Sequence, residues 1–229
     1  MERVSVSKGD LPVVLVAPHG PDDLNTDYLV ELVASEMNLF SVINRGWKKG
    51  YSVDHLNDRA DCNNISHIQE DVVREEFLEP ILRNVARIQR TLDERVFIIN
   101  IHGCGDSVRK YVDDPELDII VGYGHGPSSY SHTCSPKIKS AFVSFLEDEG
   151  FGVYEGKKRY AGRAKNNLNQ LFKKWYPNQF VNSLQLEIVH ELRSDKQMLN
   201  LTSDALISAI DSLIMFDDTC KISRSSKYI

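Results

Sequence analysis

Two short runs of apolar residues, far apart in the chain, each lead into a histidine that is followed by a glycine. Residues 11–17 (LPVVLVA) lead through a proline to His19, and residues 97–101 (FIINI) lead directly to His102. An apolar run without polar alternation is typical of a strand that is covered on both faces. The sequence therefore predicts a sheet between two layers of helices, with two imidazoles delivered at strand ends.

Strand and helix patterns alternate along the rest of the chain, apart from a long polar loop over residues 46–70. This order predicts a three-layer α/β/α fold with a mixed, mostly parallel sheet, and we expect a single domain over residues 1–229. In such sheets a ligand site lies beyond the carboxyl ends of the strands. The further expected strands are 40–44, 117–122, 152–155 and 183–189. The expected helices are one capped by Thr26, 72–92, 135–149, and one from Thr202 or Ser203 to about 216.

Composition excludes several classes of protein. The chain has 229 residues with a net charge of −6, whereas a nucleic-acid-binding protein usually has a basic patch. Its apolar stretches are about 6 to 8 residues long, short of the roughly 20 that cross a bilayer, and its first residues show no apolar leader. The four cysteines are scattered without a CxxC pair, which suits a reducing compartment. We expect a cytoplasmic protein that binds neither nucleic acid nor membrane.

His19 and Asp22 have the spacing H-x-x-D on a turn that leaves a strand, and His102 adds a third candidate ligand. Two imidazole nitrogens and one carboxylate suit Zn²⁺ in a catalytic site that keeps one position open for water. The alternative is a hydrogen-bonded histidine beside a helix-capping carboxylate. Whether Asp22 or Asp23 would be the ligand stays open. Cys104, two residues after His102, is a weaker candidate, since no second cysteine is spaced to assist it.

Glu187 lies inside an apolar strand, where a carboxylate is costly unless it is paired or used chemically. If it faces a metal-bound water, it is a natural general base. The alternative is a salt bridge with Arg193 or Arg163.

The polar loop contains a guanidinium and three carboxylate or amide side chains, at Arg59, Asp61, Asn63 and Asn64. A guanidinium beside a zinc site can bind a substrate carboxylate or polarise the carbonyl under attack. The alternative is a solvated loop held by local side-chain turns.

The ordered set of these motifs resembles the N-formylglutamate amidohydrolase family, a branch of the zinc-carboxypeptidase-like superfamily that includes aspartoacylase. The resemblance covers roughly residues 10 to 215 and rests on Pro18-His19-Gly20, Asn44-Arg45, residues 59–64, Ile101-His102-Gly103 and residues 184–188. It implies a phosphorylase/hydrolase-like α/β fold and one zinc ion. The implied metal ligands are His19, Asp22 and His102, the implied general base is Glu187, and Arg59, Asp61 and Asn63 match the loop motif.

Two positions depart from the family pattern. The usual Asn-Arg pair is Asn63-Asn64 here, and Pro21 stands where a second glycine is expected. The first departure removes the arginine that normally binds a substrate carboxylate. Candidates for the missing charge are Arg45, Arg159 and Arg163, and Tyr160 is a candidate substrate contact.

The resemblance implies zinc-dependent hydrolysis of the amide bond of an N-acyl amino acid or a similar small molecule. Two alternatives remain: a peptidase of short acidic or γ-linked peptides, and an inactive relative that binds a small ligand. The expected partner is a small, carboxylate-bearing substrate, and assembly into a homo-oligomer is left open.

Overall fold

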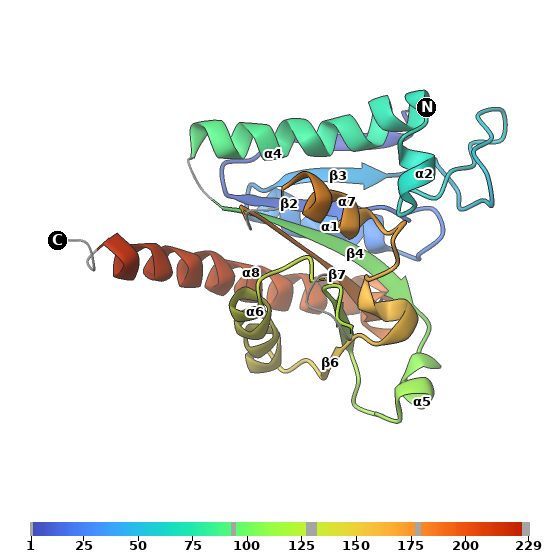
Figure 1. Cartoon of the computed structure of the whole chain (residues 1–229). Helices are drawn as coiled ribbons and strands as arrows, with labels where there is room; N and C mark the ends of the chain where they lie inside the picture. Colours follow the sequence, from blue (N-terminus) through green and yellow to red (C-terminus); the bar gives the residue numbers. More distant parts are fainter. Residues whose placement is uncertain (1, 93–94, 127–131, 177–179, 226–229) are drawn as a thin grey trace.

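One seven-stranded sheet forms the middle layer of the protein (Figure 1). The structure is a computed structural model that describes residues 2–92, 95–126, 132–176 and 180–225. The strands are β1 (Val4–Ser7), β2 (Val13–Ala17), β3 (Phe40–Asn44), β4 (Val96–Cys104), β5 (Ile119–Gly122), β6 (Val153–Glu155) and β7 (Val181–Val189).

The strand order is β1-β3-β2-β4-β7-β5-β6. Four adjacent strands, β3, β2, β4 and β7, are parallel, so their carboxyl ends meet at one edge of the sheet. Strand β1 is antiparallel to β3, β5 is antiparallel to β7, and β6 is parallel to β5. The predicted mixed, mostly parallel sheet is therefore confirmed.

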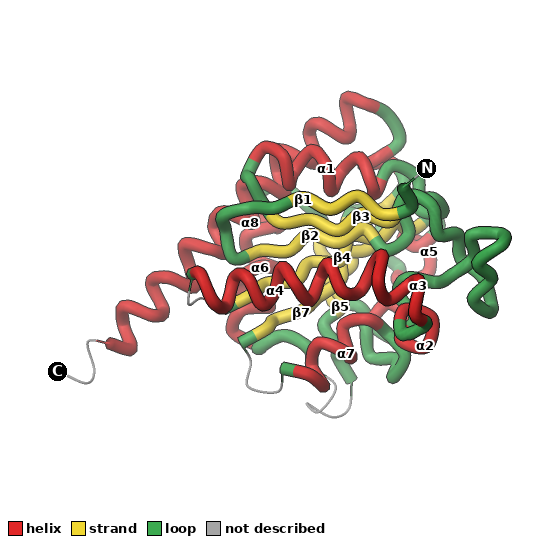
Figure 2. Tube along the Cα trace, turned by 90° about the horizontal axis from the view of Figure 1, so that it is seen from above, coloured by secondary structure: helices red, strands yellow, loops and turns green. Residues whose placement is uncertain are grey.

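Helices cover both faces of this sheet. Helices α1 (Thr26–Glu36), α6 (Pro136–Asp148) and α8 (Lys196–Ser225) pack on one face and share an apolar core with it. Helices α4 (Glu79–Thr91) and α7 (Leu168–Trp175) cross the other face over a second core (Figure 2). The remaining helical segments are short: α2 (Ile65–Ile68), α3 (Asp71–Val73), the π-helical turn η1 (Arg74–Leu78), α5 (Val108–Val112), and the 3₁₀ turns η3 (Lys158–Ala161) and η4 (Glu191–Arg193).

Two predicted helix starts were wrong. The residue before α1 is Asn25, in a left-handed conformation (φ 59°), and the Thr26 hydroxyl donates to Asp23 O instead of capping the helix. Helix α8 begins at Lys196, because the Asp195 carboxylate accepts hydrogen bonds from the first backbone N–H groups. Thr202 is buried within that helix and donates to Leu192 O.

Helix α8 is longer and more apolar than the short apolar stretches expected from the sequence. Its segment Lys196–Asp217 is long and apolar enough to span a membrane by length and composition, and 39% of the most apolar 18-residue window in it is buried. Its buried residues, among them Leu206, Ile210 and Leu213, belong to the core shared with α1 and α6. A core helix of this length passes the same test, and here the apolar face of α8 lies against the sheet layer.

Candidate metal centre

Two imidazoles meet at the carboxyl edge of the parallel strands. His19 follows β2, and His102 lies in β4, which pairs with β2 in parallel register. Both side chains are buried, and their Nδ1 atoms lie 3.1 Å apart. The sequence prediction that these two histidines come together is confirmed by this geometry.

The carboxylate that joins the imidazoles is that of Asp23, not that of Asp22. The backbone N–H groups of both residues donate to His19 O, so the chain makes one helical turn after the histidine. A residue four positions on returns to the same side of such a turn. Asp23 Oδ2 therefore lies 3.4 Å from His19 Nδ1 and 3.7 Å from His102 Nδ1. The exposed Asp22 carboxylate instead accepts from the backbone N–H of Lys49 at 2.8 Å.

The three ligand atoms fit a divalent metal ion. Bond lengths of about 2.0–2.1 Å at tetrahedral angles place ligand atoms roughly 3.3 Å apart. The observed separations between His19 Nδ1, His102 Nδ1 and Asp23 Oδ2 are 3.1, 3.4 and 3.7 Å. On the other side of its ring, the buried His102 Nε2 atom has no hydrogen-bond partner among the described residues. The donor set, two nitrogens and one oxygen, is typical of a catalytic zinc site.

Asp61 orients the first imidazole from its far side. Its Oδ1 lies 2.8 Å from His19 Nε2 and also accepts from Asn63 N at 2.9 Å. The Asp61 backbone N–H donates to Nδ1 of the buried His67 at 3.0 Å. A carboxylate on the outer nitrogen of a ligating histidine fixes the tautomer that presents the other nitrogen to the metal. The structure thus places the Asp61 carboxylate against His19, whereas the sequence predicted it only in a substrate-binding loop.

Lys49 contacts the cluster although the sequence patterns did not single it out. Its ammonium lies 2.9 Å from Asp23 Oδ1, whereas Asp23 Oδ2 accepts from Gly103 N at 3.1 Å. The two oxygens of Asp23 therefore have different partners: Oδ1 contacts Lys49, and Oδ2 faces the imidazoles.

Hydrogen bonds and nearby charges shift the pKa values of His19, Asp23 and Asp61 toward their charged forms. Burial alone would raise the pKa of Asp23, but hydrogen bonds with His102 and His19 outweigh burial and hold this pKa well below its ordinary value. Burial would also raise the pKa of Asp61, but the hydrogen bond with His19 contributes to a net lowering of this pKa. Burial would lower the pKa of His19, but hydrogen bonds with both carboxylates outweigh it and raise this pKa. The carboxylates of Asp23 and Asp61 therefore stay anionic, and anionic oxygens favour a bound cation.

Glu187 lies beside the cluster in the next strand. It is the register partner of His102 in the parallel β4–β7 pair, and burial raises the pKa of its carboxyl. Among the described residues no lysine or arginine forms a salt bridge with it. The guanidinium of Arg193 instead donates to the carbonyls of Leu24, Cys104 and Ile188.

Gly103 allows the close approach of this guanidinium to β4. A Cβ at position 103 would lie 2.3 Å from Arg193 Cζ, so any other residue there would displace the guanidinium. Arg193 therefore joins the ends of β4 and β7 to the turn before α1, and its three carbonyl partners leave it structural rather than a charge partner of Glu187.

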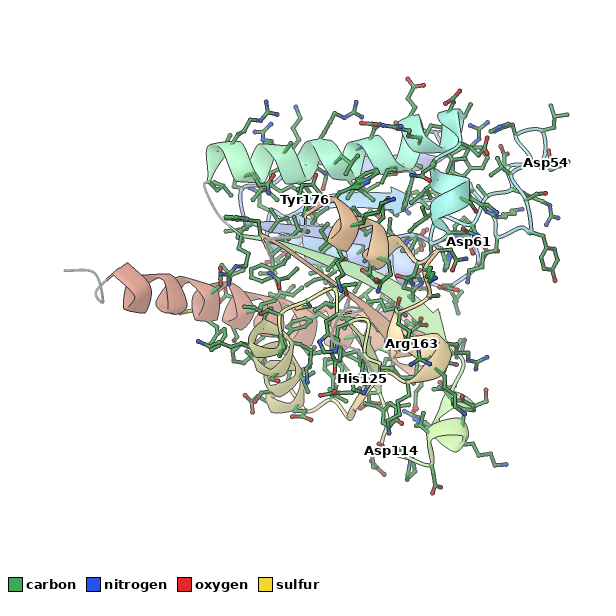
Figure 3. The ribbon with its side chains drawn as sticks, in the orientation of Figure 1. Asp54, Asp61, Asp114, His125, Arg163 and Tyr176 are labelled. Atoms are coloured by element: carbon green, nitrogen blue, oxygen red, sulfur yellow. The ribbon has the colours of Figure 1, made fainter. Side chains whose placement is uncertain are left out.

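Arg59 lines a cleft beside the cluster formed by His19, Asp23 and His102. The cleft has a volume of about 650 Å³, and its lining includes Lys49, Arg59, Asp61 and Asn64. Figure 3 shows Asp61 at the end of the sheet toward which β4 points, with Asp54 farther out in the projecting loop. The exposed Arg59 side chain thus shares this cleft with Asp61 and Lys49, which contact His19 and Asp23.

Other candidate residues lie elsewhere or have structural partners. Arg45 forms ion pairs with Asp27 and Glu31 of α1. Asn63 accepts from Leu168 N, and Asn64 caps α2.

Tyr160 and Arg163 lie in and just after η3, on the β5 side of the site. The Tyr160 hydroxyl accepts from its neighbour Arg159 at a short distance, and burial raises its pKa. Arg163 is exposed, at the same end of the sheet as Asp61 in Figure 3. Their roles in substrate binding stay predictions.

Comparison with known proteins identifies the fold. No family model and no curated protein sequence matches the chain. Among solved structures, N-formylglutamate amidohydrolase from Ralstonia eutropha JMP134 aligns over 93% of this chain and 98% of its own, with 14% identity and a TM-score of 0.59. A bacteriophage poly-gamma-glutamate hydrolase aligns over 91% and 87%, with 13% identity and a TM-score of 0.53.

A metallo-carboxypeptidase from Burkholderia cenocepacia aligns over 94% of this chain and 66% of its own, with 13% identity and a TM-score of 0.53. The expected resemblance in fold is therefore confirmed, since the amidohydrolase and carboxypeptidase structures are both among the similar ones. At these identities the similarity establishes the fold, and the chemistry has to be argued from the site.

Proposed function

We propose that this protein is a zinc-dependent hydrolase that cleaves the amide bond of an N-acyl amino acid or a similar small molecule. The observation that carries the proposal is the triangle formed by His19 Nδ1, His102 Nδ1 and Asp23 Oδ2 at the carboxyl edge of the sheet. The three solved structures compared above bear the names of hydrolases, and they share this fold. One Zn²⁺ ion is the proposed cofactor.

A divalent ion held by these three residues supplies Lewis acidity, which lowers the pKa of water toward about 7 and polarises an amide carbonyl. Asp61 and Lys49 fix the orientations of His19 and Asp23. Glu187 then acts as the proton carrier. Its carboxylate takes a proton from the attacking water and passes it to the leaving nitrogen as the C–N bond breaks. Its raised pKa makes it a stronger base than an exposed glutamate.

The cleft beside the cluster offers two cations to a substrate, Arg59 and Lys49, and two carboxylates, Asp54 and Asp61, line it as well. Asn64 stands where the resemblance described above places a substrate-binding arginine. We propose that Arg59 stabilises the developing oxyanion and that Lys49 adds positive charge for a substrate carboxylate.

The decisive experiment compares zinc-loaded and chelator-treated protein on a panel of N-formyl, N-acetyl and N-succinyl amino acids. We expect hydrolysis that chelation abolishes and added zinc restores, together with loss of turnover in Glu187→Gln at unchanged zinc content. Turnover that survives complete removal of metal would rule the proposal out. Stoichiometric zinc without turnover on any amide would instead favour the inactive, ligand-binding alternative.

A second candidate substrate is a short γ-linked or acidic peptide. The observation that favours it is the likeness to the bacteriophage hydrolase, whose name specifies poly-gamma-glutamate. Adding γ-glutamyl di- and tripeptides to the same panel separates the two classes by their kcat/KM values.

A further inference from the structure

One face of β7 carries a buried stripe of polar side chains that leads to Glu187. Ser183, Gln185 and Glu187 alternate along the strand with Leu184, Leu186 and Ile188, which belong to the apolar core on the opposite face. Because successive strand residues point to opposite sides of a sheet, the three polar residues share one face. Ser183 and Gln185 are almost completely inaccessible to solvent. Polar groups this deeply buried require hydrogen-bond partners.

The partner of Glu187 in this stripe is the amide of Gln185. Gln185 Nε2 donates to Glu187 Oε1 at 3.0 Å, and Gln185 Oε1 accepts from Asn167 Nδ2 at 3.0 Å. Asn169 Nδ2 lies 3.4 Å from the same oxygen. The Gln185 side chain is also enclosed, since a Cβ at Gly122 would lie 2.7 Å from its Cγ.

The direction of the Gln185 amide is dictated by the main chain of α7. Asn167 is the N-cap of this helix, and its Oδ1 accepts from the backbone N–H of Asn169 at 2.9 Å. A backbone N–H can only donate, so Asn167 Oδ1 is an acceptor and its Nδ2 is the group that faces Gln185. Gln185 must then present its oxygen to Asn167 and its NH₂ group to Glu187.

This arrangement makes the two oxygens of Glu187 inequivalent. Oε1 is held by the Gln185 N–H, and among the described residues no cation pairs with the carboxylate. A donor that is fixed on one carboxylate oxygen locks the plane of the group and leaves the other oxygen to exchange a proton.

We propose that Gln185 is a positioning residue for the general base, with its amide held by Asn167 so that Glu187 Oε2 is the oxygen that carries the proton. The inference rests on the proposed function. In the reaction, Oε2 accepts a proton from water as the water oxygen bonds to the amide carbon. Oε2 then returns that proton to the nitrogen as the C–N bond breaks, so that Glu187 ends unchanged.

The test substitutes the amide without removing bulk. In Gln185→Met the N–H donor is lost, and we expect kcat to fall about 10- to 100-fold. The KM value and the zinc content should stay close to those of the wild type, whereas the thermal unfolding midpoint should fall, because Asn167 Nδ2 loses its buried acceptor. The matched control is Gln170→Met, the same exchange in α7, where the amide donates to Gly162 O instead. This control should keep the wild-type kcat.

A second variant tests the direction of the amide and decides the question if Gln185→Met does not fold. In Asn167→Asp the side chain still caps α7, because aspartate is a good N-cap, but it has no N–H group for Gln185. The Gln185 amide then turns its NH₂ group toward position 167 and presents its oxygen to Glu187. We expect kcat to fall about tenfold or more at unchanged KM.

Folded, zinc-loaded variants of Gln185 and Asn167 whose kcat values lie within about twofold of the wild type would overturn the inference while the proposed function stands. A parallel rise in KM or loss of zinc would also overturn it, because either result assigns Gln185 to substrate or metal binding. If the zinc-loaded wild type hydrolyses no amide, the proposed function fails first and the inference fails with it.

Discussion

The position of the carboxylate ligand can be tested by a pair of neighbouring substitutions. Asp23→Asn replaces the carboxylate whose Oδ2 lies within 3.7 Å of both Nδ1 atoms. Asp22→Asn makes the same chemical change one residue earlier, where the exposed carboxylate accepts one hydrogen bond, from Lys49 N. Only the first substitution should weaken metal binding.

The magnitude follows from sharing the binding energy among ligands. Structural zinc sites bind with about 10–16 kcal/mol, or roughly 3 kcal/mol for each of four ligands. Because 1.4 kcal/mol corresponds to a factor of ten, loss of the Asp23 carboxylate should weaken zinc binding by about 100-fold. In Asp22→Asn the new amide oxygen would still accept the Lys49 N–H, so this substitution should change the affinity by less than about twofold.

The assay is competition for zinc with a chromophoric chelator, supported by metal analysis after gel filtration. Circular dichroism and thermal unfolding of both variants provide the control for folding. Equal losses in the two variants, or a larger loss in Asp22→Asn, would refute the assignment of Asp23 and return the ligand to the H-x-x-D spacing.

Three further predictions concern groups around the site and in the rest of the fold. Burial raises the pKa of the Cys104 thiol to about 12, so Cys104→Ala should retain amide turnover and iodoacetamide should not inhibit the wild type. Burial would raise the pKa of Glu155, but hydrogen bonding to Lys139 contributes to a net lowering of this pKa from 4.5. The Glu155–Lys139 pair therefore stabilises the fold fully above about pH 4.5, and its contribution falls as the pH drops below that value. Urea unfolding of Lys139→Met should therefore differ most from the wild type near neutral pH, and a constant difference down to pH 3 would contradict the assignment. Arg193→Met leaves two buried carbonyls, of Cys104 and Ile188, and the part-buried carbonyl of Leu24 without their donor. It should lower the free energy of unfolding by about 3 kcal/mol in urea titrations, and a change below about 1 kcal/mol would contradict this assignment.

The parts of the site that strands deliver could be predicted from the sequence. His19 and His102 follow apolar runs, and Glu187 interrupts one, so each stands out against the buried pattern around it. The choice between Asp22 and Asp23 could not be made, because it depends on the backbone turn after β2 rather than on residue type. Lys49 lies in a polar loop among many charged residues, and nothing in its spacing shows that the loop returns to Asp23.

The period-2 alternation of β7 places Gln185 on the same face of the strand as Glu187. The segment SLQLEIV has one polar and one apolar face, which marks Gln185 as a partner of Glu187. Strand β1 was missed for a different reason. Its four residues, VSVS, are short and half exposed at the edge of the sheet, and its pairing with β3 is what defines it.

The long helix expected over residues 72–92 is interrupted. The structure divides it into α3, the π-helical turn Arg74–Leu78 and α4. Apolar periodicity predicted the buried face of this segment, but one extra residue in a turn hardly changes that pattern, so the interruption was invisible.

The position of β7 in the sheet sets the order in which this protein can be completed during its synthesis. β7 is the last strand to leave the ribosome, yet it lies in the middle of the sheet, between β4 and β5. His19, Asp23 and His102 have all emerged by position 102, whereas Glu187 arrives more than eighty residues later. Until then β4 and β5 each have an edge without its final neighbour, and such edges pair readily with other chains. A nascent chain that stops before residue 181 could thus bring His19, Asp23 and His102 together while lacking both Glu187 and the strand that joins the two parts of the sheet.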